Sequence, residues 1–291
     1  MTTIARTAVV VGYDGSPASE TAAFWAATEA ARLGAKLRLV HVLALPILSS
    51  PVGIAVTVEF EPLHHAAHQL LDKVSRRIRA EHRQLVIEVV VEFGAAAAAL
   101  LQEATEARLV VLGSRGLGEF RDLTAGSVSA HVATHATCPV VVVPPDRPSE
   151  DTDGVVVGVD GSELSIDAVD FAFEQAQARN TTLTAVMAWH DPVRTGPGDL
   201  LPLVYDLDAL QQESAALLAE SVAGHAEKYP DVVVRQELVR GYPDDVLIDA
   251  SRSAELLVVG SRGRGAFRGL LLGSTSRALV HYAPCPIAVV R

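Results

Sequence analysis

Cysteine is scarce in this chain of 291 residues, which contains only Cys138 and Cys285. Each cysteine stands just before an apolar run near the end of one half of the sequence, and no Cys-x-x-Cys spacing occurs. This scarcity argues against a disulfide-rich fold, a redox pair and a cysteine metal cluster. We expect two small buried side chains, each entering a strand, in a protein of the reducing cytoplasm.

Positive charge and long apolar runs are also in short supply. The chain has 24 Lys and Arg against 35 Asp and Glu, a net charge of −11, whereas nucleic-acid binding rests on clustered basic residues. Residues 40–58 are almost uncharged, but Pro46, Pro51 and Gly53 interrupt them, so we expect a strand and an apolar loop there. The first residues do not resemble a signal peptide. We therefore expect neither nucleic acid nor membrane as a partner.

What the sequence does contain is a glycine-rich pattern that occurs twice. Gly113-Ser-Arg-Gly116, nine residues and Gly126-Ser127 return as Gly260-Ser-Arg-Gly263, nine residues and Gly273-Ser274. Each copy follows an apolar run, as a phosphate-binding loop between a strand and a helix would. For a single glycine loop, a tight turn with no ligand is the commoner explanation.

The rest of the chain repeats in the same register. Val-Gly-Tyr-Asp14-Gly-Ser returns as Val-Gly-Val-Asp160-Gly-Ser after 146 residues, and the two Cys-Pro pairs lie 147 residues apart. A period of this length indicates duplicated domains rather than a solenoid. We expect one domain at 1–144 and another at 154–291, with a proline-rich acidic linker at 145–153 between them.

Short apolar runs alternate with helix-period segments in each half. Continuous apolar strands are typical of a parallel sheet with helices on both faces. In the first half we expect strands at 8–11, 37–43, 85–91, 109–112 and 140–143, and helices at 18–33, 62–82, 95–106 and 127–135. The sequence thus predicts an α/β fold of two doubly wound, five-stranded parallel-sheet domains in tandem. Their ligand should lie beyond the carboxyl ends of the strands, where the strand order reverses.

At these residues the chain resembles a tandem universal stress protein. The Gly-x-x-Gly, nine residues, Gly-Ser pattern resembles the ATP-binding motif of that family, and the Asp-Gly-Ser turns resemble its first-strand loop. The resemblance covers both halves and implies a Rossmann-like or flavodoxin-like fold of the adenine-nucleotide α-hydrolase type. It also implies ATP and Mg²⁺ as ligands. The leading hypothesis is an ATP-binding regulator or switch in stress adaptation.

The resemblance implies a role for each matching residue. Asp14 and Asp160 would approach the adenine or ribose, Val42 and Ala188 would contact the adenine, and Ser127, Ser129, Ser274 and Ser276 would reach phosphate oxygens or bound Mg²⁺. The implied nucleotide-binding set of the first half is Gly12, Asp14, Val42, Gly113, Arg115, Gly116, Gly126, Ser127, Val128 and Ser129. That of the second half is Gly158, Asp160, Ala188, Gly260, Arg262, Gly263, Gly273, Ser274, Thr275 and Ser276.

The two glycine segments differ in charge. Arg115, Glu119, Arg121 and Asp122 sum to zero in the first, whereas Arg262, Arg264 and Arg268 give +3 in the second. Because ATP carries negative charge even with Mg²⁺ bound, we expect the second site to bind it more tightly.

Two other classes of function stay open. An ATP-consuming enzyme would usually have a Walker lysine, and no Gly-x-x-x-x-Gly-Lys-Ser/Thr occurs in the sequence, so at most we expect slow hydrolysis. A nucleotide-free stress or interaction protein is the other alternative. We expect an unknown protein partner. The family resemblance implies that the short apolar last strands mediate dimerisation, so we expect the two halves to pair within one chain and two chains to form a homodimer.

One predicted helix carries several possible metal ligands. Glu61, His64, His65, His68 and Asp72 are spaced three or four residues apart, so they could share a helix face. The corresponding segment of the second half has no histidine, and we favour an exposed helix without a bound metal.

Overall fold

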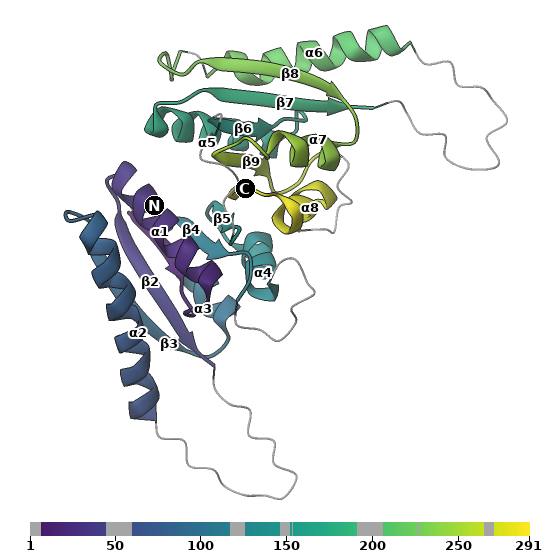
Figure 1. The fold of residues 1–291 in the computed structure, drawn as a ribbon. Helices are drawn as coiled ribbons and strands as arrows, with labels where there is room; N and C mark the ends of the chain where they lie inside the picture. The colour runs from purple at the N-terminus through teal and green to yellow at the C-terminus, as the bar shows by residue number, and fades with distance from the viewer. Residues whose placement is uncertain are drawn as a thin grey trace, which may run out of the picture. The chain divides into compact units, whose positions relative to one another are not determined.

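The structure is a computed structural model that describes residues 7–44, 60–116, 126–145, 152, 154–190, 206–225, 227–264 and 271–291. The chain forms two compact units, Met1–Arg147 and Pro148–Arg291. Each unit is a parallel sheet with helices on both faces (Figure 1). The predicted α/β fold with two doubly wound domains is confirmed.

The first unit has its strands in the order β3-β2-β1-β4-β5, all parallel. Helices α1 and α2 pack together on one face of this sheet, and α3 and α4 pack together on the other. Its elements are β1 (Ala8–Gly12), α1 (Pro17–Arg32), β2 (Lys36–Leu43), α2 (Phe60–Glu81), β3 (Ile87–Phe93), α3 (Ala96–Glu103), β4 (Ala107–Gly113), α4 (Ser127–His135) and β5 (Val140–Val143).

The second unit repeats this arrangement with the strand order β8-β7-β6-β9-β10, again all parallel. Helices α5 and α6 are neighbours on one face, and α7 and α8 on the other. Its elements are β6 (Val155–Gly158), α5 (Glu163–Arg179), β7 (Leu183–Trp189), α6 (Leu207–Ala223), β8 (Val234–Arg240), α7 (Pro243–Ala250), β9 (Leu256–Gly260), α8 (Ser274–Tyr282) and β10 (Ile287–Val290).

The core of each unit lies around its central strands. In the first unit, Val9, Val10 and Val11 of β1 are fully buried, as expected for a strand covered on both faces. The helix α1 buries a row of alanines against this sheet, at positions 22, 23, 26, 27 and 30. Their small side chains let the helix backbone lie close to the strands, so the start of α1 is placed directly over the end of β4.

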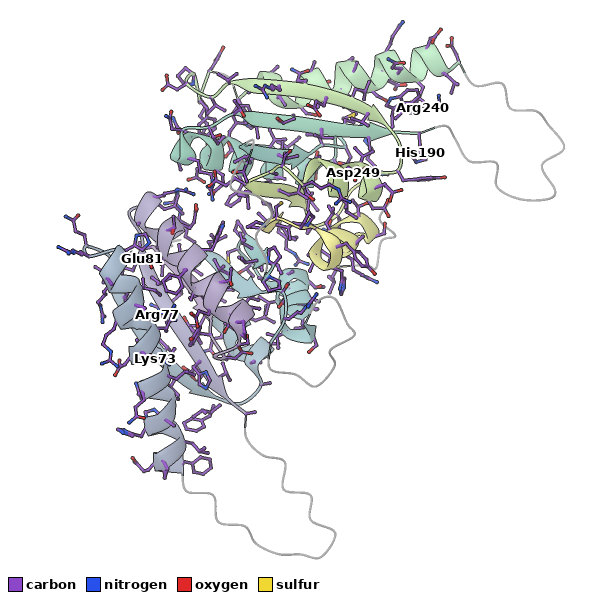
Figure 2. The ribbon with its side chains drawn as sticks, in the orientation of Figure 1. Lys73, Arg77, Glu81, His190, Arg240 and Asp249 are labelled. Atoms are coloured by element: carbon purple, nitrogen blue, oxygen red, sulfur yellow. The ribbon has the colours of Figure 1, made fainter. Side chains whose placement is uncertain are left out.

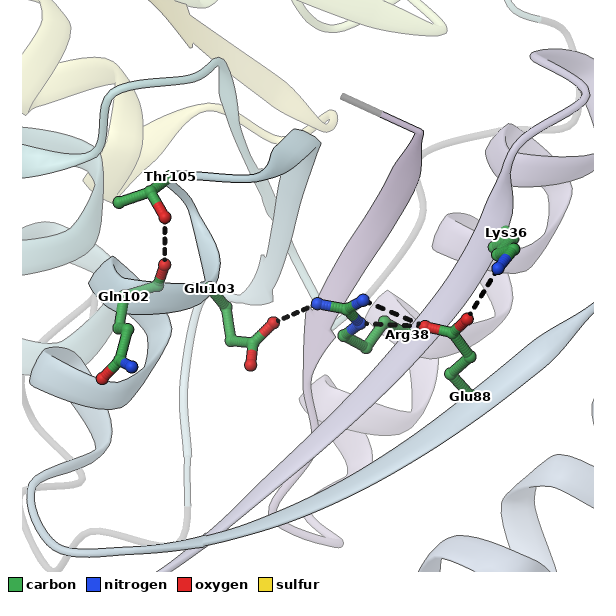
Figure 3. Close-up of polar contacts among 6 residues, drawn as sticks. All are labelled: Lys36, Arg38, Glu88, Gln102, Glu103 and Thr105. Atoms are coloured by element: carbon green, nitrogen blue, oxygen red, sulfur yellow. Dashed lines mark hydrogen bonds and ion pairs between the residues drawn. The ribbon is translucent and has the colours of Figure 1, made fainter. Parts of the chain in front are cut away.

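Charged side chains fasten the edge strand β3 to its neighbours. Arg38 of β2 bonds Glu88 of β3 at 3.1 Å and Glu103 of α3 at 2.7 Å, and Lys36 donates to Glu88 at 3.0 Å (Figure 3). The hydrogen bonds from Lys36 and Arg38 hold the pKa of Glu88 below its ordinary value. These ion pairs join β2, β3 and α3 without involving the carboxyl end of β1.

We predict that Phe173→Ala strongly destabilises the second unit. The Phe173 ring is fully buried and stacks with His225 at 5.1 Å and Tyr229 at 5.4 Å between ring centroids, so truncation costs about 3–5 kcal/mol. Ile166→Ala on the same helix is the matched control, because Ile166 is 48% exposed. Urea denaturation followed by circular dichroism measures both. Equal midpoints for the two variants would contradict the assigned packing.

Candidate functional site

Each unit has an Asp-Gly-Ser turn between its first strand and the helix that follows. Gly15 has a φ of +83°, a conformation that favours glycine. The Ser16 hydroxyl accepts a hydrogen bond from the backbone N of Ser19 at 3.2 Å and caps α1. The same arrangement recurs at Gly161, with a φ of +74°, and at Ser162. The glycine and serine of this motif therefore build the helix start.

The aspartate of each turn faces the glycine-rich loop of the same unit. Oδ1 of Asp14 accepts from the backbone N of Ser16 at 2.9 Å, and a Cβ on Gly116 would lie only 2.7 Å from its Oδ2. In the second unit, Oδ2 of Asp160 accepts from the backbone N of Arg264 at 2.8 Å. A Cβ on Gly263 would collide with that same oxygen. The carboxylate thus joins the two loops that the strand order brings together.

The first glycine of each loop allows a strand to end against a helix. A Cβ on Gly113 would lie 2.7 Å from the carbonyl carbon of Ala18 in α1, and a Cβ on Gly260 would lie 2.8 Å from the carbonyl oxygen of Leu164 in α5. Backbone atoms cannot move aside cheaply. These two glycines therefore hold each loop against the first helix of its unit.

The last glycine of each loop begins a helix that has no side-chain cap. Gly126 is the N-cap of α4 and Gly273 that of α8, and neither helix start has a side-chain hydrogen bond to its amides. The backbone N of Gly126 bonds the carbonyl of Ser114 at 2.6 Å, which closes the loop. Free amides and the positive end of the helix dipole attract anions. Phosphate binding at these two helix starts stays a prediction.

The serines of α4 and α8 fall into two groups. Ser127 and Ser274, at the first helical position, are exposed, so their hydroxyls are accessible to a ligand. Ser129 and Ser276 are buried, and their hydroxyls donate to the carbonyls of Gly113 and Gly260 at 2.7 Å in both units. These two hydroxyl groups therefore hold the glycine loop to the helix and have no proton left to donate to a ligand. The half-buried Val128 and Thr275 lie between the serines of each pair.

The expected adenine contacts lie at the carboxyl ends of the second strands. Val42 in β2 and Ala188 in β7 are both half-buried there. Beside them, Gly12 and Gly158 serve packing, because a Cβ at either position would meet a leucine side chain at 2.8 or 2.9 Å. Contact between these residues and a base stays a prediction.

Two side-chain pairs lie at this end of the second unit. The Arg240 guanidinium lies 5.6 Å from the Trp189 ring centroid, and the His190 and Tyr242 rings are 5.2 Å apart. Figure 2 shows His190 and Arg240 at the same end of β7 and β8. The corresponding first-unit residues are Leu43, Ala44, Phe93 and Ala95. The motifs in the sequence do not point to these residues, although an alignment of the two halves reveals the difference.

Basic residues lie beside both glycine loops. Arg115 and Arg262 are exposed beside Gly126 and Gly273. The Arg264 guanidinium lies next to Gly161, where a Cβ would come within 2.8 Å of it. The other charged positions of the two loops, Glu119, Arg121, Asp122 and Arg268, lie outside the described residues. Arg291 joins this group: burial and the nearby Arg262 guanidinium both lower its pKa.

Other possible sites lie away from this edge. Cys138 and Cys285 are buried free thiols, and burial raises the pKa of Cys285 to about 12, which suppresses thiolate chemistry. In α2, His64 and His68 lie 4.5 Å apart, and His64 stacks on Phe93. Within the described residues, no three His, Cys, Asp or Glu side chains converge as metal ligands. No described helix is long and apolar enough to cross a membrane.

Comparison with known proteins identifies the family. Residues 6–144 and 152–291 match the model of the Universal stress protein family. The chain belongs to this family. A universal stress protein of Mycobacterium tuberculosis is 38% identical over 292 residues, covering 97% of this chain and 96% of the relative. A second one from the same organism is 37% identical over 303 residues, covering 97% and 94%. The resemblance seen in the sequence is thereby confirmed.

A solved structure shares the fold over the whole chain. A universal stress protein from Archaeoglobus fulgidus superposes with a TM-score of 0.70 over 98% of both chains, at 19% identity. A universal stress protein solved in complex with cAMP matches 49% of this chain and 99% of its own, with a TM-score of 0.38 at 27% identity. The bound cAMP was found in that protein.

In this universal stress protein, the two kinds of loop glycine should respond differently to alanine. We predict that Gly113→Ala and Gly260→Ala each lower the free energy of unfolding by about 1–3 kcal/mol, because the new Cβ overlaps helix backbone. Gly126→Ala and Gly273→Ala are the controls, since their nearest Cβ contacts are 3.6 and 3.5 Å. Thermal denaturation compares the four variants. Equal losses of unfolding free energy in both pairs would show that the close approach of the helix backbone does not require glycine at 113 and 260.

Proposed function

We propose that this universal stress protein binds ATP with Mg²⁺ at the carboxyl edge of the sheet in each unit. The nucleotide acts as a regulatory ligand, and a protein partner responds to the nucleotide-bound state. The observation that carries the proposal is the convergence, in both units, of a carboxylate, a glycine loop and an uncapped helix start at one sheet edge.

The phosphates fit the loop and the helix start. The amides at the starts of α4 and α8 have no side-chain cap, and the exposed hydroxyls of Ser127 and Ser274 lie on the first turn. Anions bind well at such helix starts. Mg²⁺ would bind the phosphate oxygens, with these two hydroxyls and water as further oxygen ligands. When bound, it would neutralise part of the phosphate charge.

The nucleoside fits the opposite side of the same edge. Parallel pairing places the end of β2 beside β1, and Tyr13 N bonds the carbonyl of Val40 at 2.8 Å. The backbone near Val42 can therefore present polar groups to the edge of a base. Asp14 lies between that strand end and the glycine loop, where its carboxylate can accept a hydrogen bond from ribose.

A regulatory role follows from what the ligand would join. Asp160 already connects the Asp-Gly-Ser turn to the glycine loop through Arg264 N, and a nucleotide would span the same two loops. Binding then stabilises the conformation in which both loops are in place. As part of this proposal, two chains form a homodimer, which light scattering at micromolar concentration tests.

The direct test of the proposed function is a titration of the full chain with ATP, GTP and cAMP in the presence of Mg²⁺. We expect ATP to bind more tightly than GTP, since strand backbone reads the adenine edge. We also expect cAMP to bind more weakly than ATP, because it has one phosphate. Isothermal calorimetry measures all three. Equal affinity for ATP and GTP, or no binding of either, would overturn the proposal.

We predict that Asp14→Ala and Asp160→Ala each weaken ATP binding in their own unit. Loss of a hydrogen bond to a charged group costs about 1.5–3 kcal/mol, which corresponds to a Kd raised roughly tenfold or more. Asp249→Ala is the control. Asp249 forms an exposed pair with Arg252 and lies near the end of α7, which returns the chain to the opposite edge of the sheet. Unchanged affinity in folded Asp14 and Asp160 variants would remove the assigned role.

The second site should bind ATP more tightly and lose affinity faster as salt is added. The loop from Arg262 to Ser274 carries three positive charges, whereas the first loop sums to zero. Salt screens such attraction. Titrations of Gly126→Ala and Gly273→Ala at low and high salt compare the two sites. The Gly273 variant should lose the tighter, more salt-sensitive site; loss of that site in the Gly126 variant instead would contradict the charge argument.

A further inference from the structure

Arg291 occupies a place in the second unit that has no basic counterpart in the first. It follows β10 directly, and Val290 pairs in register with Gly260 of β9. The backbone N of Ser261 bonds the carbonyl of Val290 at 2.7 Å, so Arg291 emerges beside the glycine loop. After β5, the residue at the equivalent position is Pro144.

The Arg291 side chain reaches the part of this loop that leads into α8. Its Nη2 donates to the carbonyl of Leu271 at 2.9 Å, two residues before Gly273, the N-cap of α8. Burial is the main cause of the lowered pKa of Arg291, and the nearby Arg262 guanidinium lowers it further. Two like charges are therefore held near each other beside an uncapped helix start, an arrangement that an anion between them would stabilise.

Two further features of the loop fit an anionic ligand. The Cα of Arg262 lies 3.5 Å from the position that a Cβ on Gly273 would take. The backbone of this arginine is therefore close to the free amides at the start of α8. Ser261 is 1% exposed, and among the described residues its hydroxyl has no hydrogen-bond partner. A buried polar group without a partner is costly, and a ligand or water that reached this hydroxyl would remove that cost.

We propose that Arg262 and Arg291 form a clamp for a chain of two or more phosphates, so that the second site selects nucleoside di- and triphosphates over monophosphates. Arg291 is the specificity-determining residue of this clamp. The amides at the start of α8 and Arg262 bind one phosphate, and Arg291 binds the next phosphate in the chain. The first unit, with Pro144 at this position, discriminates less by phosphate number. This inference rests on the proposed function and names the ligand class of one of its two sites.

The test uses the full chain with Trp25→Phe, which leaves Trp189 as the only tryptophan. Trp189 ends β7 in the second unit, next to Ala188, so its indole NMR signal assigns binding to that unit. In this background, Arg291→Gln removes the charge and Arg291→Lys keeps it. Arg252→Gln is the matched control, because Arg252 is an exposed arginine of the same unit near the opposite sheet edge.

Each variant is titrated by calorimetry with ATP, AMP and inorganic tripolyphosphate at low salt. We expect Arg291→Gln to weaken ATP and tripolyphosphate binding at the second site about tenfold, as for loss of a charge-assisted phosphate contact, and to change AMP binding less than about twofold. Arg291→Lys should keep most of the preference, and Arg252→Gln all of it. Thermal denaturation confirms that each variant is folded.

Two outcomes overturn the clamp. If Arg291→Gln preserves the ratio of ATP to AMP affinity, Arg291 does not select phosphate number, although adenine-nucleotide binding by the parent still stands. If Arg291→Gln preserves tripolyphosphate binding, Arg291 does not bind phosphate. By contrast, a parent that binds tripolyphosphate through Arg291 but binds ATP no better than GTP supports the clamp and contradicts the proposed adenine specificity.

Discussion

The parallel pairing of β1 with β4, and of β6 with β9, is the constraint on which both candidate sites depend. Because these strands are neighbours and run the same way, the turns at their carboxyl ends must meet at one edge. Gly113 and Gly260 then let each strand end directly against the first helix of its unit. This placement brings the aspartate, the glycine loop and the start of α4 or α8 together in each unit.

Duplication preserved this framework and changed what surrounds it. The aspartate turn, the loop closure and the buried serine that anchors the loop are the same in both units. The differences lie in the side chains around each site. The second unit has Trp189 and Arg240 near the expected position of the base, and Arg291 near the expected position of the phosphates. Under the proposed function, the shared framework gives the two sites the same ligand class, and the differing side chains give them different affinities.

Much of the fold could be predicted from the sequence, because buried parallel strands and their helices leave strong apolar patterns. The limits of β5 and α4 were predicted to the residue. The prediction for β3 began two residues too early, at Leu85, because the backbone N of Leu85 closes a turn onto His82. As an edge strand, β3 is only half-buried, so its apolar pattern marks its ends poorly.

The candidate site was predictable only in part. Glycine spacing located the loops, and strand order brought Asp14 and Asp160 to them. Sequence could not separate Ser127, which is exposed, from Ser129, whose hydroxyl is bonded to Gly113, because that distinction depends on helix orientation. Arg291 was missed since it lies 18 residues beyond Gly273 in sequence and reaches the loop only through the pairing of β10 with β9.

The central claim is that the Asp-Gly-Ser turn and the glycine loop of each unit form an adenine-nucleotide site. A competition experiment tests this claim most directly. The full chain is incubated with equimolar ATP, GTP and cAMP plus Mg²⁺, separated rapidly from free ligand, denatured, and its released nucleotides are identified by mass spectrometry. We predict that ATP is recovered in excess over both competitors, and that Asp14→Ala combined with Asp160→Ala lowers the total amount of nucleotide recovered. Recovery of no nucleotide, or of ATP and GTP in equal amounts, would contradict the account.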